Sequence, residues 1–117
     1  MDNKKFIDVD LIISECGVDS DKDRDIVIQN ILNLENKYNF YELIQIYNQL
    51  LVTVKDPKIL MNVITCADKF RDSSTLGPLV DLLLTKNNID EHMEIDDLIN
   101  LRVLCAKAIS NHKDTSV

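Results

Sequence analysis

The chain has 117 residues and a formal net charge of −7, and 45% of its residues are hydrophobic. This length predicts one globular domain over residues 1–117. The excess of acids argues against nucleic acid as a direct partner, because phosphate binding depends on clustered Lys and Arg. No apolar run approaches the ~20 residues of a transmembrane helix, and residues 1–5 do not begin a signal peptide. We therefore expect a cytoplasmic protein with no membrane partner, whose three cysteines are reduced thiols.

Six segments carry apolar side chains at three- and four-residue spacing, the pattern of a single apolar stripe on a helix. They predict helices over residues 4–16, 26–37, 40–54, 57–70, 76–84 and 96–111. Only two glycines and two prolines occur, a composition that favours helices over the many turns of a β-sandwich. The predicted fold class is therefore all-α, with about six helices.

Local signals mark several of the helix ends. Gly17 follows the first segment, where a glycine commonly ends a helix. Asn39 and Glu42 have the spacing of a capping box, in which each side chain accepts a hydrogen bond from the other residue's backbone N–H. Asp56 precedes Pro57, so an N-capping carboxylate is followed by a proline in the first turn, where a missing N–H costs nothing. These signals predict short connections between the second, third and fourth helices.

The sequence repeats with a period just under 40 residues. Cys66-Ala67 matches Cys105-Ala106 at a shift of 39 residues, and Leu43-Ile44 matches Leu79-Val80 at a shift of 36. Periods of this size are typical of antiparallel helical hairpins that bury their apolar faces by stacking. A non-repetitive helical bundle would explain the same apolar stripes and is the alternative. Three stacked hairpins are expected, over residues of about 4–37, 39–72 and 74–112.

One stretch resembles a known repeat family. Residues 101–109 have the sequence Leu-Arg-Val-Leu-Cys-Ala-Lys-Ala-Ile, which resembles the second helix of a HEAT repeat, where an aliphatic–Arg pair precedes a run of small residues. The resemblance implies a HEAT/armadillo-like α-α superhelix. The small residues on the apolar stripes separately predict that Ala67 and Ala106 are buried where helices meet. It also implies that Arg102 bonds a carboxylate or a helix-end carbonyl of the preceding hairpin, for which Asp56 is our first choice.

An alternating run of acids invites comparison with a calcium loop. Asp19, Asp21, Asp23 and Asp25 alternate as calcium ligands do. Arg24 stands where such a loop needs glycine, so the match fails at a decisive position. An acidic turn that caps a helix explains the same residues, because the N-terminus of a helix favours negative charge. We therefore expect no metal site here.

The histidines and cysteines also give no sign of catalysis. His92 and His112 lack a Cys or His partner at zinc-ligand spacing, and we expect both in solvent. Cys66 and Cys105 lie on apolar stripes, where packing explains them better than nucleophilic chemistry. The sequence carries no glycine-rich phosphate loop. We predict no catalytic residues, no cofactor and no enzymatic activity.

Acidic residues gather towards the two ends of the chain, with a net charge of −4 over residues 1–38, 0 over 39–86 and −3 over 87–117. Small, acidic, helical proteins of this kind resemble immunity proteins of bacterial contact-dependent growth inhibition and related polymorphic toxin–antitoxin systems. The resemblance implies that the chain binds a basic toxin domain, often a nuclease, and blocks its cleft with acidic side chains. The residues expected to bind are, first, Asp90, Glu91, Glu94, Asp96 and Asp97 and, second, Asp19, Asp21, Asp23 and Asp25.

Two other classes of function stay open at this point. The chain is alternatively a HEAT-repeat scaffold or adaptor, or a fragment of a longer helical array, because no polar capping helix follows the last predicted helix. Enzymes are the third class, since HEAT-like folds occur in DNA glycosylases and chromophore lyases. The absence of a basic groove and of tryptophan argues against a glycosylase.

Overall fold

The structure is a computed structural model that describes residues 7–18, 23–84 and 94–115, with the side chains of the last helix described as far as residue 112. The described residues form helices and no strands, which confirms the all-α prediction. Two short 3₁₀ turns, η1 (Leu34–Asn36) and η2 (Ser73–Thr75), precede α3 and α5. The six α-helices are α1 (Val9–Cys16), α2 (Arg24–Asn33), α3 (Phe40–Thr53), α4 (Pro57–Asp68), α5 (Leu76–Leu84) and α6 (Ile95–Thr115).

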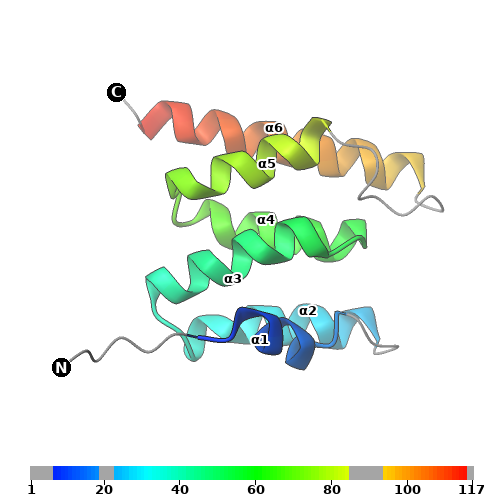
Figure 1. Ribbon diagram of the computed structural model, residues 1–117. Helices are drawn as coiled ribbons and strands as arrows, with labels where there is room; N and C mark the ends of the chain where they lie inside the picture. Colours follow the sequence, from blue (N-terminus) through cyan, green and yellow to red (C-terminus); the bar gives the residue numbers. More distant parts are fainter. Residues whose placement is uncertain (1–6, 19–22, 85–93, 116–117) are drawn as a thin grey trace.

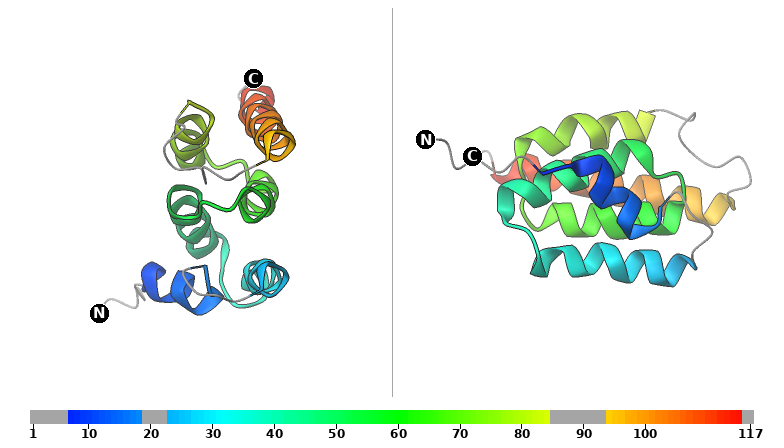
Figure 2. Two further views of the ribbon diagram at one scale, coloured as in Figure 1. Left: turned by 90° about the vertical axis from the view of Figure 1, so that its right-hand side faces the viewer. Right: turned by 60° about the horizontal axis from the view of Figure 1, so that its bottom comes forward.

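The helices form three antiparallel hairpins that stack in two layers (Figure 1). Helices α1, α3 and α5 make one layer and α2, α4 and α6 make the other, as the view along the helices shows (Figure 2, left). Each helix packs against its hairpin partner and against the next helix of its own layer. Each hairpin therefore buries its apolar side chains only with the help of a neighbouring hairpin.

The predicted helix-end signals act as expected. The Asn39 side chain accepts a hydrogen bond from the Glu42 N–H at 2.9 Å, and the Glu42 carboxylate accepts one from the Asn39 N–H at 3.0 Å. Asp56 caps α4, with Pro57 in its first turn. Gly17 ends α1 at a φ of 92°, a left-handed conformation that favours glycine. The predicted boundaries differ mainly at the ends of the chain, where α1 begins at Val9 and α6 continues to Thr115.

The middle hairpin contains the best-buried side chains. Residues of α3 and α4 with no exposed surface include Ile46, Tyr47, Leu50, Leu60, Val63 and Ile64. The hairpin is covered on one side by α1 and α2 and on the other by α5 and α6. The core of the domain therefore runs through its centre and thins towards the first and last hairpins.

Cys66 and Cys105 are buried, as the packing interpretation predicts. Burial raises the pKa of the Cys105 thiol to about 11 and is also the main cause of the raised pKa of Cys66. Both thiols therefore stay protonated near neutral pH, which disfavours nucleophilic chemistry. The prediction for His112 is wrong, because its side chain is buried in α6. His92 lies outside the described residues.

The starts of helices α4 and α6 lie 38 residues apart, one fewer than the predicted shift of 39. They begin at Pro57 and Ile95. At this shift Ala67 corresponds to Cys105, and both are buried. A helix turns by about 100° per residue, so an error of one residue moves a side chain to a different face. Ala67 is buried as predicted, but Ala106 is exposed and the prediction for it is wrong.

The predicted pairing of Arg102 with Asp56 is also wrong. Asp56 accepts a hydrogen bond from Arg24 instead, at 2.8 Å. Arg102 is half-buried, and its buried Nε has no hydrogen-bond partner. At the 38-residue shift Arg102 corresponds to Ile64, which lines a hollow between α4 and α6. From α6 the same hollow is lined by Leu104, Lys107 and Ala108, and not by Arg102.

Candidate protein-binding surface

Helices α2, α4 and α6 all begin at the same end of the molecule, the right-hand end in Figure 1. The first turn of each helix presents unpaired N–H groups and a partial positive charge, which favour carboxylates. Six acids lie at the starts of these helices, and we call this set the acidic end: Asp23, Asp25, Asp56, Glu94, Asp96 and Asp97. Acids from both acidic regions of the sequence are thus brought to one end of one layer.

Two acids of α2 belong to the second predicted set. Asp23 is the N-cap, and its carboxylate accepts a hydrogen bond from the Asp25 N–H at 2.9 Å. Asp25 lies in the first turn and is exposed. Asp23 therefore has a structural role, whereas Asp25 presents its carboxylate to solvent.

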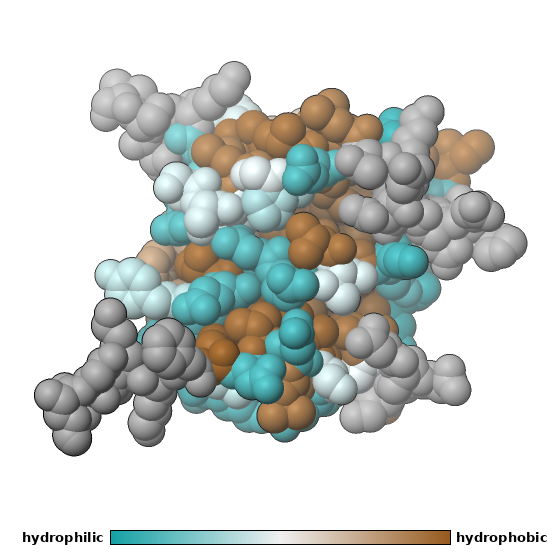
Figure 3. Space-filling view, viewed as in Figure 1, coloured by the Kyte–Doolittle hydropathy of each residue, from teal (hydrophilic) through white to brown (hydrophobic). Residues whose placement is uncertain are grey.

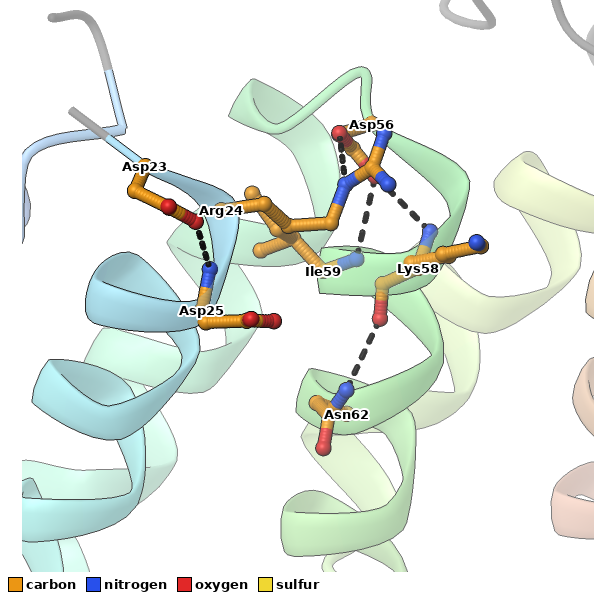
Figure 4. A network of polar contacts seen from close by, with 7 residues as sticks. All are labelled: Asp23, Arg24, Asp25, Asp56, Lys58, Ile59 and Asn62. Atoms are coloured by element: carbon orange, nitrogen blue, oxygen red, sulfur yellow. Dashed lines mark hydrogen bonds and ion pairs between the residues drawn. The ribbon is translucent and has the colours of Figure 1, made fainter. Parts of the chain in front are cut away.

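An ion pair joins the start of α2 to the start of α4 (Figure 4). Arg24 Nε lies 2.8 Å from Asp56 Oδ2, and the other carboxylate oxygen of Asp56 accepts from the N–H groups of Lys58 and Ile59. The hydrogen bond to Asp56 is the main cause of a raised pKa of Arg24, and the charges of Asp56, Asp97 and Asp25 add to it. The Asp56 carboxylate therefore accepts hydrogen bonds both from the start of α4 and from Arg24.

The start of α6 carries the described part of the first predicted set. Glu94 and Asp96 are exposed, and Asp97 is half-buried. Asp97 lies close enough to Arg24 to raise its pKa, so the start of α6 and the start of α2 share one electrostatic environment. In the described part of this end, the cations near these acids are Arg24, Lys55 and Lys58, fewer than the acids.

Four of the predicted binding residues lie outside the described residues: Asp19, Asp21, Asp90 and Glu91. Sequence reasoning missed Arg24 and Asp56, the pair at the centre of the acidic end. They are 32 residues apart, and no local spacing rule connects residues at that separation. The sequence indicated only that each residue stands at a helix start: Asp56 as an N-cap, and Arg24 directly after one.

Two small hollows are lined by described residues. One hollow of about 110 Å³ lies between α4 and α6, and another of about 100 Å³ lies between α1 and α2. Typical ligand pockets measure about 300–1,000 Å³, and neither hollow is lined by a residue of the acidic end. Among the described residues, no three His, Cys, Asp or Glu side chains are placed to hold a metal ion. Four of the six carboxylates of the acidic end, those of Asp23, Asp25, Glu94 and Asp96, are exposed.

No protein-family model, curated protein or solved structure matches the chain. In the part of the chain that the structure describes, no helix is both long and apolar enough to cross a membrane.

Proposed function

We propose that this chain is a non-enzymatic, cytoplasmic protein-binding module that uses its acidic end to bind one basic protein. The observation that supports the proposal is the convergence of Asp25 with Glu94, Asp96 and Asp97, residues about 70 positions apart in sequence, at one end of the second layer. Three of these four carboxylates, those of Asp25, Glu94 and Asp96, are exposed. They are available to a partner.

The partner class is a basic toxin domain, and the chain acts as its immunity protein. Carboxylates projecting from a rigid helical layer take the places of substrate phosphates in a basic cleft and so keep the substrate out. Opposite charge also speeds the encounter, because complementary potentials steer association. Helix starts hold these carboxylates in fixed positions, which lowers the entropy lost on binding.

The test uses the acidic-end variant Asp25→Lys, Glu94→Lys and Asp96→Lys. Its control is Asp10→Lys, Glu15→Lys and Asp81→Lys, an equal change of charge at exposed acids elsewhere. Binding to a basic toxin domain encoded beside this gene is measured by stopped-flow kinetics at low and at physiological salt. The acidic-end variant should associate about 10–100-fold more slowly at low salt, and added salt should reduce the difference.

The same variants are tested in cells that produce the toxin domain. Wild type and the control should restore growth, and the acidic-end variant should not. Equal association rates for the two variants would refute the acidic-end mechanism. Failure of the wild-type chain to bind any basic domain encoded beside its gene would refute the proposed function itself.

A further inference from the structure

The hollow of about 110 Å³ between α4 and α6, which we call the α4–α6 hollow, has a largely aliphatic lining. Ile64 and Ala108 are buried in it, and Leu104 is half-buried. Thr65 and Lys107 also line it and are exposed, so it opens to solvent. A cavity of about 150 Å³ takes one benzene molecule. The hollow therefore has room for part of one side chain of a partner and not for a larger ligand.

One carboxylate lines the hollow at an unfavourable position in its helix. Asp68 is the last residue of α4, and the C-terminus of a helix carries a partial negative charge that favours cations. Both carboxylate oxygens accept hydrogen bonds from the Asn111 amide, at 3.1 and 3.3 Å. Asp68 forms no ion pair with a cation in the described part of the chain. Each oxygen keeps a second acceptor position, so Asp68 can accept further hydrogen bonds.

Lys107 lines the same hollow and is its one cation among the described residues. It is exposed, whereas Asp68 is half-buried. Water and salt screen an exposed charge more strongly than a partly buried one. The carboxylate therefore has the larger influence on a side chain that enters the hollow, and the hollow favours a cation.

We propose that the α4–α6 hollow receives one arginine side chain of the basic protein that the acidic end binds; this inference rests on the proposed function. The stem of an arginine packs on aliphatic surface while its charged head stays among polar groups. The guanidinium presents its N–H groups in a planar fork that matches the two oxygens of a carboxylate, which the point charge of lysine does not. Leu104 and Ala108 hold the stem, and Asp68 accepts hydrogen bonds from the head.

The hollow and the acidic end lie on the same side of α6. Leu104 follows Asp97 by seven residues, which is two helical turns or about 10 Å along the axis. One partner can therefore contact both places. Exposed charges act mainly on the association rate, whereas a desolvated, hydrogen-bonded charge pair acts mainly on the dissociation rate. The acidic end thus steers the partner, and the hollow holds it.

The first test titrates the chain with N-acetyl-arginine methylamide and follows backbone amide signals by nuclear magnetic resonance. The signals of Asp68, Leu104 and Ala108 should shift and saturate in the millimolar range. The citrulline analogue, with the same stem and a neutral head, should bind at least about 10-fold more weakly. Asp68→Asn should weaken arginine binding by a similar factor, and Lys107→Gln should strengthen it because a like charge is removed. Asp81→Asn removes an exposed carboxylate of α5 and should change nothing.

The second test measures how fast the basic toxin domain encoded beside this gene dissociates. Asp68→Asn and Leu104→Ala should each speed dissociation at least about 10-fold and change association by less than about 2-fold. Leu84→Ala is the control for lost aliphatic surface, because Leu84 is 74% exposed on α5, in the other layer, where Figure 3 shows hydrophobic surface. It should leave both rates unchanged. Circular dichroism shows whether each variant is folded.

Equal binding of the arginine and citrulline compounds would overturn the inference. So would a toxin complex that Asp68→Asn does not weaken, or arginine binding that Lys107→Gln does not strengthen. In each of these cases the acidic-end variant would still slow association, and the proposed function would stand. A wild-type chain that binds no basic domain encoded beside its gene would refute the proposed function and, with it, the source of the arginine.

Discussion

Ala67 and Ala106 are identical residues in different surroundings. Ala67 is 1% exposed in the centre of the stack, and Ala106 is exposed on α6. The small side chain is required only where another helix approaches, because close-packed interiors have no room for added methyl groups. The packing around each alanine, and not the residue type, therefore decides how much a larger side chain at that position would destabilise the fold.

Ala67→Leu should lower the free energy of unfolding by about 1–3 kcal/mol, since three added carbon atoms must displace well-packed neighbours. Ala106→Leu is the matched control and should change it by less than about 0.5 kcal/mol. Urea unfolding is followed by circular dichroism. Equal losses for the two variants would show that Ala106 is packed as closely as Ala67.

Helix α4 shows how one side chain can serve two elements. Asp56 accepts hydrogen bonds from two N–H groups at the start of α4 and pairs with Arg24 of α2. The cap satisfies backbone groups that would otherwise depend on water. The ion pair is partly exposed on both sides and is screened by solvent. The cap should therefore contribute more to stability than the pair.

Asp56→Ala should destabilise the chain by about 1 kcal/mol through loss of the cap. Arg24→Ala should cost about 0.5 kcal/mol or less, because exposed ion pairs contribute little. Chemical unfolding of both single variants and the double variant gives the coupling between the two residues. A larger loss for Arg24→Ala than for Asp56→Ala would contradict this ranking.

The sequence contains enough local information to predict the helices but not how they face each other. Asn39 with Glu42, and Asp56 with Pro57, act within one turn of a helix, so their spacing predicts where α3 and α4 begin. The position of Ala106 depends on rotation about the helix axis, and shifts of 38 and 39 both align small and aliphatic residues. The position of Arg24 beside Asp56 depends on the stacking of two hairpins, which no local pattern encodes.

The candidate site, too, could be predicted from the sequence only in part. Charge patterning alone indicated that Asp25, Glu94, Asp96 and Asp97 are candidate binding residues. Their meeting at one end follows from the parallel direction of α2 and α6 within a layer, which becomes clear only once the hairpins are stacked (Figure 1). Acids from both acidic regions of the sequence therefore share one surface of the molecule.

The whole molecule is a short stack, and its stability should vary from hairpin to hairpin. The middle hairpin has a neighbour on each side, whereas each terminal hairpin has one among the described residues. In a stack of hairpins, stability is roughly the sum of each hairpin's own contribution and its contacts with direct neighbours. Local opening should therefore cost least in the outer hairpins.

Hydrogen exchange followed by mass spectrometry should show the slowest amides in α3 and α4. These helices contain Ile46, Leu50, Leu60 and Val63, none of which has exposed surface, and their amides should exchange only when most of the stack opens. Amides of α1 should exchange fastest among the described helices, because that helix is short and lies at the end of the stack. Each rate is compared with the rate of the unfolded chain under the same conditions. Protection of α1 equal to that of α3 and α4 would mean that the chain opens as one cooperative unit and that its hairpins do not differ in stability.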